Sequence, residues 1–251
     1  MNDSQPYDSL FYAYQREGAL RSARRVAPIV SKTLGVKSVL DVGCGAGAWL
    51  CAHAENGVAD LRGVDGDYVD RSLLLFDEAR FTPADITQPL DLGAAFDLVQ
   101  CLEVAEHIPR DRGPALIDNL TRHGEAVLFS AATPGQGGKG HINERSLDYW
   151  RGLFAERGYL AFDFLRPLIV GDTQVEWWYR YNTLLYVHAL AVPCLPKTVR
   201  DAQCSIGVKI KDYSPATLKL RKLALQALPA GIVSRIAAIK HWYVTRSLSA
   251  G

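Results

Sequence analysis

A short apolar run that ends in a series of glycines most constrains how this chain can fold. Residues Ser38–Val42 (SVLDV) are too few for a helix, and Gly43, Gly45 and Gly47 follow almost at once. We therefore expect a buried strand that enters a tight turn, because glycine adopts the backbone conformations that such turns require. Residues 46–54 then have the pattern of a helix, whose first amide groups would face a ligand bound at the turn.

The alternation of strands and helices continues along the chain. Further strands are predicted at 61–65, 80–85, 96–102, 125–131, 159–166 and 183–190. Helices are predicted at 7–33, 69–78, 87–95, 112–123, 146–157, 215–228 and 231–247. Strands that alternate with helices indicate an α/β fold with a mostly parallel sheet and helices on both faces.

The composition is that of an ordinary globular protein. The 251 residues are 48% apolar and 22% charged, which excludes a collagen, a disordered chain and a multi-span membrane protein. The polar, acidic N-terminus predicts no signal peptide. The five cysteines have neither zinc nor disulfide spacing, so we expect reduced thiols and a cytoplasmic protein.

Charge is unevenly distributed. Residues 191–251 carry ten Lys or Arg against two acids, a net +8, and because the whole chain carries +1 the remainder carries −7. We expect this basic segment to meet an anionic membrane surface, which would place the protein at the inner surface of the membrane, or an acidic carrier protein. Alternatively, its helices pack on their own domain or on a second copy in a homodimer. Nucleic acid is not expected, since there is no separate RNA-binding module.

Acidic residues occur at the ends of the first three predicted strands. Asp41 lies within the end of the first strand, where it would repel a pyrophosphate. Asp65 ends the second strand, in a position to accept hydrogen bonds from ribose hydroxyls, and Asp85 and Ile86 follow the third, near an adenine. A Gly-x-Gly repeat also occurs in nicotinamide-dependent Rossmann enzymes, but Asp41 and Asp85 argue against that alternative.

These residues closely resemble the class I S-adenosylmethionine-dependent methyltransferases. The motifs VLDVGCGAGAWL, GVDGD, PADI and FDLVQCLEVAEHIP occur in the order and at the spacing of that family. The resemblance implies that the chain binds S-adenosylmethionine and releases S-adenosylhomocysteine. It also implies a Rossmann-like sheet of seven mostly parallel strands whose last strand is antiparallel, with Leu184–Ala189 as a central antiparallel strand.

The same resemblance assigns the cofactor contacts. In chain order they are Asp41, Gly43, Cys44, Gly45, Asp65, Gly66, Asp85, Ile86, Cys101 and Leu102. The first four would line the methionine half, the next two the ribose and the following two the adenine, with the last two beneath the methionine moiety. The chain would then consist of an N-terminal helical cap (1–36), a methyltransferase domain (37–192) and a basic amphipathic helical extension (193–251).

A cluster of acids and histidines follows the fourth strand. A helical turn over 103–107 would place Glu103, Glu106 and His107 on one face, and His141 lies in a glycine-rich loop after the fifth strand. Both segments would lie at the carboxyl ends of the strands, where parallel-sheet enzymes bind their ligands.

Two chemical designs suit this cluster, beside a purely structural role. In the first, His107 or His141 is a general base, with Glu103 as a further catalytic candidate. In the second, Glu103, Glu106, His107 and His141 hold a divalent metal ion such as Mg²⁺, Mn²⁺ or Fe²⁺, which lowers the pKa of a substrate hydroxyl. The E-x-x-E-H spacing with a later His is similar to small-RNA 3′-terminal and quinone-biosynthesis O-methyltransferases.

An aromatic segment offers candidates for acceptor binding. Trp177, Trp178 and Tyr179 would form a wall of the acceptor pocket, with Tyr14 of the first helix on the other side, unless these rings serve as core. We expect methyl transfer to a hydroxyl of a polar small molecule or a glycan-like natural product, in small-molecule biosynthesis. The alternatives are N-methyl transfer to a small molecule or carrier-tethered substrate, and a non-catalytic S-adenosylmethionine-binding protein.

Overall fold

A seven-stranded sheet forms the centre of the computed structural model, which describes residues 5–226 and, for the first helix, side chains from residue 17. The strands are β1 (Ser38–Val42), β2 (Asp60–Asp65), β3 (Phe81–Pro83), β4 (Leu98–Leu102), β5 (Ala126–Ser130), β6 (Tyr159–Phe162) and β7 (Leu184–His188). Their order is β3-β2-β1-β4-β5-β7-β6. Strand β7 is antiparallel to both β5 and β6, and the other pairs are parallel, so the expected sheet is confirmed.

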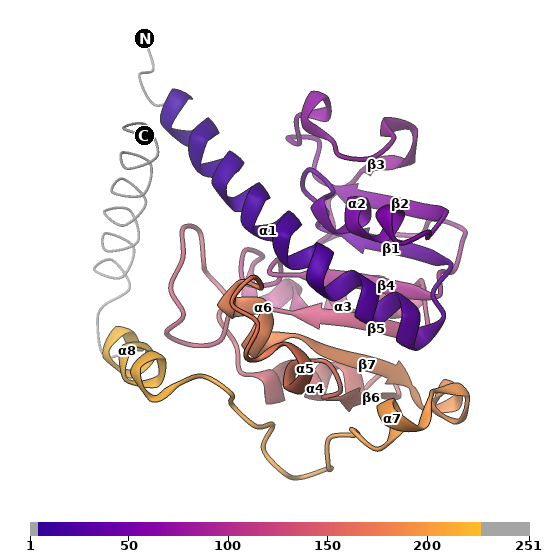
Figure 1. The fold of residues 1–251 in the computed structure, drawn as a ribbon, viewed down its shortest axis with the longest axis vertical. Helices are drawn as coiled ribbons and strands as arrows, with labels where there is room; N and C mark the ends of the chain where they lie inside the picture. Colours follow the sequence, from indigo (N-terminus) through magenta and orange to yellow (C-terminus); the bar gives the residue numbers. More distant parts are fainter. Residues whose placement is uncertain (1–4, 227–251) are drawn as a thin grey trace.

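Helices cover both faces of this sheet, and α1 crosses one face diagonally (Figure 1). The α-helices are α1 (Gln5–Leu34), α2 (Ala48–Glu55), α3 (Gly113–Arg122), α4 (Leu147–Ala155), α5 (Arg166–Ile169), α6 (Trp177–Asn182), α7 (Lys197–Arg200) and α8 (Ala216–Gln226). Short 3-10 helices span Arg71–Leu73, Glu78–Arg80, Arg110–Arg112 and Ala189–Cys194.

Two hydrophobic cores lie on opposite faces of the sheet. Successive side chains of a strand point to opposite faces, so Val39 of β1 joins one core while Leu40 and Val42 join the other. The first core is completed by α1 and α2, which contribute residues such as Val26 and Leu50. The second core is completed by α3 and α4. Because both faces are covered, the central strands are mostly apolar, with Asp41 of β1 and Gln100 of β4 as buried polar residues.

The helix predicted over 69–78 is wrong. Two single 3-10 turns replace it, and each begins at an aspartate. The carboxylate of Asp70 accepts a hydrogen bond from the amide of Ser72, and that of Asp77 accepts one from the amide of Ala79. Such local side-chain bonds compete with helix propagation and favour isolated turns.

The helix predicted over 87–95 is wrong as well, because distant side chains take its backbone donors. The amide of Leu90 donates to Oδ1 of Asn119 at 2.9 Å, and the amide of Leu92 donates to Nε2 of His123 at 3.0 Å. The segment is therefore held in an irregular course against α3. Hydrogen bonds of this kind leave no periodic signal in the sequence.

The C-terminal segment is described as far as α8, which matches the first of its two predicted helices. The second, predicted at 231–247, lies outside the described residues. Within 5–226, no helix combines the length and hydropathy needed to cross a bilayer. The three-part division of the chain stays a prediction, and α1 shares its buried Ala23 and Val26 with the core of the sheet.

Candidate functional site

The turn between β1 and α2 is built from glycines in left-handed backbone conformations. Gly43, Gly45 and Gly47 have φ angles of 81°, 51° and 79°. A Cβ on Gly43 would lie 2.5 Å from the side chain of Val104, so the turn packs directly against the segment that follows β4. At Gly45, by contrast, no heavy atom of the described residues lies within 4 Å of such a Cβ. The bare backbone there faces open space, which suits a ligand lying against it.

Asp65 lies beside this turn at the end of β2. Its Oδ2 accepts a hydrogen bond from the amide of Gly45 at 2.7 Å, and its Oδ1 accepts one from the amide of Gly66 at 2.7 Å. Oδ1 also accepts from the hydroxyl of Tyr68 at 2.6 Å, a partner that the sequence did not suggest. A fixed carboxylate next to an open glycine turn fits the ribose of S-adenosylmethionine.

Asp41 is buried beneath the turn, at the end of a chain of buried polar groups. Burial raises its pKa to about 7, and the charge of Asp65 acts in the same direction. In the same interior, Ser31 Oγ is 2.8 Å from Nδ1 of His53, whose Nε2 is 3.1 Å from Oε1 of Gln100. Burial also lowers the pKa of His53 to about 4. These interior polar partners were not found from the sequence, which carries no sign of them.

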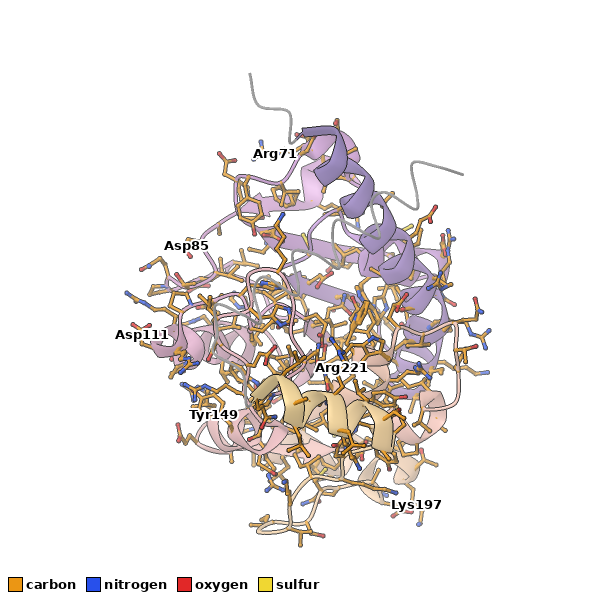
Figure 2. All side chains as sticks on the ribbon, turned by 90° about the vertical axis from the view of Figure 1, so that its left-hand side faces the viewer. Arg71, Asp85, Asp111, Tyr149, Lys197 and Arg221 are labelled. Atoms are coloured by element: carbon orange, nitrogen blue, oxygen red, sulfur yellow. The ribbon has the colours of Figure 1, made fainter. Side chains whose placement is uncertain are left out.

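The predicted adenine contacts lie beyond β3. Asp85 is exposed at the surface (Figure 2), and its Oδ1 accepts bonds from the amide and hydroxyl of Thr87 at 2.9 and 2.6 Å. The hydroxyl bond with Thr87 is the main cause that lowers the pKa of Asp85. The neighbouring Ile86 is half-buried, and its carbonyl accepts from Asn119 Nδ2 at 2.9 Å. Their adenine role stays a prediction.

The two cysteines and the leucine that were predicted to contact the cofactor have buried side chains. Cys44, Cys101 and Leu102 all pack within the two cores. Burial raises the pKa of both thiols, so neither supplies a thiolate for chemistry at neutral pH. All five cysteines are free.

The helical turn expected over 103–107 is wrong. Glu103 has a φ of 58°, and it is the only described non-glycine residue with a positive φ, so the chain leaves β4 in a left-handed bend. The Glu103 carboxylate therefore does not share a helical face with the following residues. It accepts a hydrogen bond from Gln136 Nε2 at 3.0 Å and one from Asn182 Nδ2 at 3.5 Å.

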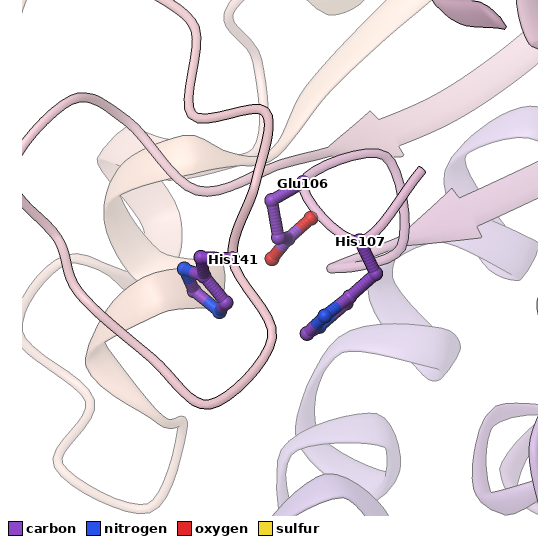
Figure 3. Close-up of side chains that lie close together, drawn as sticks. All are labelled: Glu106, His107 and His141. Carbon is purple, nitrogen blue, oxygen red and sulfur yellow. The ribbon is translucent and has the colours of Figure 1, made fainter. Parts of the chain in front are cut away.

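The structure instead brings together Glu106, His107 and His141 (Figure 3). Potential ligand atoms of these three residues all lie within 4.8 Å of one another, and Glu103 is outside this group. The two imidazole rings are 4.9 Å apart and nearly perpendicular. Glu106 is buried, and its Oε2 has no hydrogen-bond partner among the described residues. Burial, reinforced by the charge of Glu103, raises the pKa of Glu106.

The two histidines are held by a loop whose glycines make room for them. His141 Nδ1 lies 3.0 Å from Glu144 Oε1, and His107 Nδ1 lies 3.2 Å from the carbonyl oxygen of Gly140. A Cβ on Gly138 would lie 2.2 Å from the ring of His141, so a larger residue would displace the imidazole. Sequence reasoning missed Glu144, although its position three residues after His141 was an available signal.

The donor set of this cluster fits a divalent metal ion as well as a proton acceptor. An unpartnered buried carboxylate oxygen and two imidazoles match the ligand preferences of Mn²⁺ or Fe²⁺. A carboxylate such as Glu144 bonded to a ligating histidine is the usual support of a metal site. Desolvation by the surrounding protein, together with the neighbouring His141, lowers the pKa of His107 below 6.5. The ring is therefore neutral at pH 7, as both designs require.

The aromatic segment forms α6. Tyr179 is buried and meets Trp49 edge to face, with ring centroids 5.0 Å apart, so it serves the core as the packing alternative expected. Trp177 and Trp178 are half-buried, and their acceptor role stays a prediction. Tyr14 lies in α1, but its side chain is outside the described part of the structure.

Comparison with known proteins agrees with this fold. The family described as a methyltransferase domain matches residues 12–162. The sugar N-methyltransferase KedS8 from a Streptoalloteichus species is similar in structure, with a TM-score of 0.55, 18% identity, and coverage of 72% of this chain and 92% of that one. DesVI from Streptomyces venezuelae gives a TM-score of 0.53 at 14% identity, covering 75% of this chain and 100% of that one.

A third similar structure is CalS10, an amino pentose methyltransferase from Micromonospora echinaspora. Its TM-score is 0.53 at 16% identity, and the match covers 74% of this chain and 97% of that one. At such identities the likeness concerns the fold. No curated protein matches by sequence.

Proposed function

Because this chain belongs to the methyltransferase domain family, we propose that it transfers a methyl group from S-adenosylmethionine to a hydroxyl of a polar small molecule or glycan-like acceptor. Family membership establishes the reaction class and decides against the nicotinamide-dependent alternative. The acceptor is the proposed part. The observation that carries it is the Glu106–His107–His141 cluster. Glu106 and His107 follow β4 shortly after Val104, the residue that packs on the glycine turn, and His141 joins them from the loop after β5.

The chain's own residues divide between holding the cofactor and preparing the acceptor. When bound, S-adenosylmethionine supplies an electrophilic methyl group on a sulfur that departs as a neutral thioether, so the protein mainly aligns the acceptor and manages its proton. We assign the ribose hydroxyls to Asp65 and the methionine half to the backbone of Gly43 and Gly45.

His107 is suited to take the acceptor proton. Its ring is neutral at pH 7 because its pKa is lowered, and it lies at the exposed rim of the cluster, where an acceptor can approach. As the bond between acceptor oxygen and methyl carbon forms, the hydroxyl proton passes to the ring nitrogen. His141, bonded to Glu144, presents a second imidazole with a fixed orientation.

A metal-assisted form of the same reaction uses the same three residues. Glu106, His107 and His141 would hold a divalent ion, and such an ion lowers the pKa of a bound hydroxyl. Removal of metal ions by a chelator distinguishes the metal-assisted reaction from the reaction that uses histidine alone. Activity that survives EDTA and is unaffected by added Mn²⁺ assigns the proton to histidine alone.

N-methyl transfer is the second candidate. Burial raises the pKa of both Glu103 and Glu106, and the negative charge that the pair carries when ionised would attract the positive charge of an amine, whether free or tethered to a carrier. The similar folds of KedS8, a sugar N-methyltransferase, and CalS10, an amino pentose methyltransferase, make amino sugars the first amines to try.

The test begins with the cofactor and proceeds to the acceptor. Calorimetric titration with S-adenosylhomocysteine, with NAD as the control ligand, should show binding of the first alone. A panel of hydroxylated and aminated sugars is then screened for release of S-adenosylhomocysteine, in wild type and in the His107→Ala and His141→Ala variants. Full activity in both variants would falsify the proposed role of the cluster.

The peripheral location predicted for the basic segment also remains a proposal. Helix α8 leaves Leu220 and Leu223 exposed by 67% and 61%, next to the cationic Lys219. Exposed leucines beside lysines suit an anionic membrane surface. Co-sedimentation with anionic vesicles, compared with neutral vesicles, measures this directly.

A further inference from the structure

Helix α8 packs against the protein in an unusual orientation. Its Lys222 is only 8% exposed, while the adjacent Leu220 and Leu223 face solvent. Surface helices normally bury leucines and expose lysines, because burial of an ammonium group is costly unless it is hydrogen-bonded and its charge is balanced. The position of Lys222 therefore calls for specific partners.

One of those partners, Thr133, belongs to the segment that leads into the acceptor cluster. Lys222 Nζ donates to Oγ1 of Thr133 at 2.8 Å and to Oγ of Ser214 at 3.2 Å. Burial lowers the pKa of Lys222, and the charges of Asp212, Glu103 and Glu144, in decreasing order, oppose this effect and favour the ammonium form. The lysine thus supplies a cation near two carboxylates of the candidate site.

The helix also contacts the backbone of the same loop, residues 133–141. A Cβ on Gly135 would lie 2.2 Å from the carbonyl oxygen of Lys222, so helix and loop are in direct contact. Arg221 donates to the carbonyl oxygen of Gln136 at 3.3 Å, and Gln226 donates to that of Pro134 at 2.7 Å. Figure 2 looks onto α8, with Arg221 labelled.

From this loop the contacts continue to the acceptor cluster. Gln136 donates from its side chain to Glu103 at 3.0 Å. Glu144 accepts hydrogen bonds from the amides of Gly135 and Gly137, each at 2.7 Å, and also contacts the imidazole of His141 at 3.0 Å. A displacement of the loop would therefore move both Glu103 and His141.

We propose that α8 is part of the acceptor site and that Lys222 is a positioning residue, which fixes loop 133–141 and thereby the orientation of His141. This inference rests on the proposed role of the Glu106–His107–His141 cluster. It gives the C-terminal extension a role in positioning loop 133–141, which the net charge of that extension does not suggest.

The test compares Lys222→Met with Lys219→Met in the full-length protein. Methionine keeps the length and helix propensity of lysine but removes the ammonium. Lys219 is the matched control, because it lies on the same helix and is half exposed. Its ammonium lies 3.2 Å from the carbonyl oxygen and 4.0 Å from the carboxylate of Asp212, outside loop 133–141.

We expect Lys222→Met to accelerate amide hydrogen exchange in 133–141 about tenfold or more, with β1 and β4 unchanged. The ¹⁵N imidazole resonances of His141 should shift in this variant and stay unchanged in Lys219→Met. Calorimetric affinity for S-adenosylhomocysteine should remain within about twofold, because Lys222 does not contact the cofactor residues. Gly135→Ala, which pushes the loop away from α8, should reproduce the local exchange and the resonance shift.

Two results would overturn the inference. One is wild-type exchange and wild-type His141 resonances in Lys222→Met. The other is acceleration spread over the whole sheet, which would make Lys222 a general stabiliser. Neither readout requires methyl transfer, so failure of the proposed chemistry, seen as full activity of His107→Ala and His141→Ala, is distinguished from failure of this inference.

Discussion

The Tyr68 hydroxyl donates a hydrogen bond to Oδ1 of Asp65 over 2.6 Å, and the Tyr68 ring lies against the backbone of Gly66. This hydroxyl occupies the acceptor atom that a ribose would use. In the proposed binding mode, with the ribose of S-adenosylmethionine at Asp65, the cofactor would compete with Tyr68 for this atom.

Tyr68→Phe should strengthen cofactor binding. The phenyl ring is kept, while the competing hydrogen bond, typically about 0.5–1.5 kcal/mol, is removed. We expect S-adenosylhomocysteine to bind about two- to tenfold more tightly by calorimetry. Asp65→Ala is the opposing control, in which binding should be lost. Weaker binding in Tyr68→Phe would show that the hydroxyl contacts the cofactor instead of competing with it.

Two glycines with similar backbone angles allow the turn to be tested against a matched control. Gly43 and Gly57 have φ angles of 81° and 84°, but only at Gly43 would a Cβ collide with a neighbour, Val104. Gly57→Ala should cost the left-handed backbone penalty of about 1–2 kcal/mol and leave S-adenosylhomocysteine binding intact. Gly43→Ala should cost more stability and weaken binding as well. Chemical denaturation and calorimetry measure the two effects, and equal losses in both variants would contradict the account.

The pH profile of methyl transfer should report the lowered pKa of His107. The reaction needs the neutral ring, so activity is retained at pH 7 and falls only as the pH drops through the His107 pKa. The acid limb of kcat/KM should therefore lie below 6.5, the ordinary value for histidine. His107→Ala should lower kcat by about 10²–10⁴-fold and remove this limb. Asp111→Asn, an exposed change in the 3-10 helix that follows His107, should leave the profile unchanged.

His53 should make stability depend on pH. Its pKa is about 4 in the folded protein against an ordinary 6.5, so between these values the unfolded chain binds a proton that the folded protein does not. Its stabilising contribution is fully present above pH 6.5 and is lost as the pH falls toward 4.

When the pH is lowered from 7 to 4, the free energy of unfolding should fall by about 3 kcal/mol less in His53→Gln than in wild type. Urea unfolding at a series of pH values measures this difference. Because the other ionisable groups are common to both proteins, their contributions cancel. Parallel stability curves for the two proteins would contradict the burial of a neutral His53.

Elements with a strong local pattern were predicted well. The run Ser38–Val42 followed by glycines indicated β1 and its turn, and the structure confirms both. The antiparallel strand β7, between β5 and β6, was expected only from the family resemblance. Periodicity could not predict it, because strand order depends on pairings between distant segments.

The candidate site was predicted in composition but not in geometry. Glu106, His107 and His141 do come together, yet Glu103 leaves the group because its left-handed backbone turns the carboxylate toward Gln136 and Asn182. No propensity predicts a glutamate in that conformation, because it depends on hydrogen bonds from residues far along the chain.

The sequence by itself determined where the parallel strands end and which residues stand there, since alternation and glycine spacing are local properties. It also indicated the family, through motifs whose order and spacing resemble those of the methyltransferases, and the family match agrees. Only the tertiary structure decided that the Lys222 side chain is buried, that the Tyr68 hydroxyl donates a hydrogen bond to Asp65, and that Glu144 contacts the His141 ring. The physical reason is that each of these depends on a partner brought close by the fold, and the free energy of a buried polar group is decided by that partner.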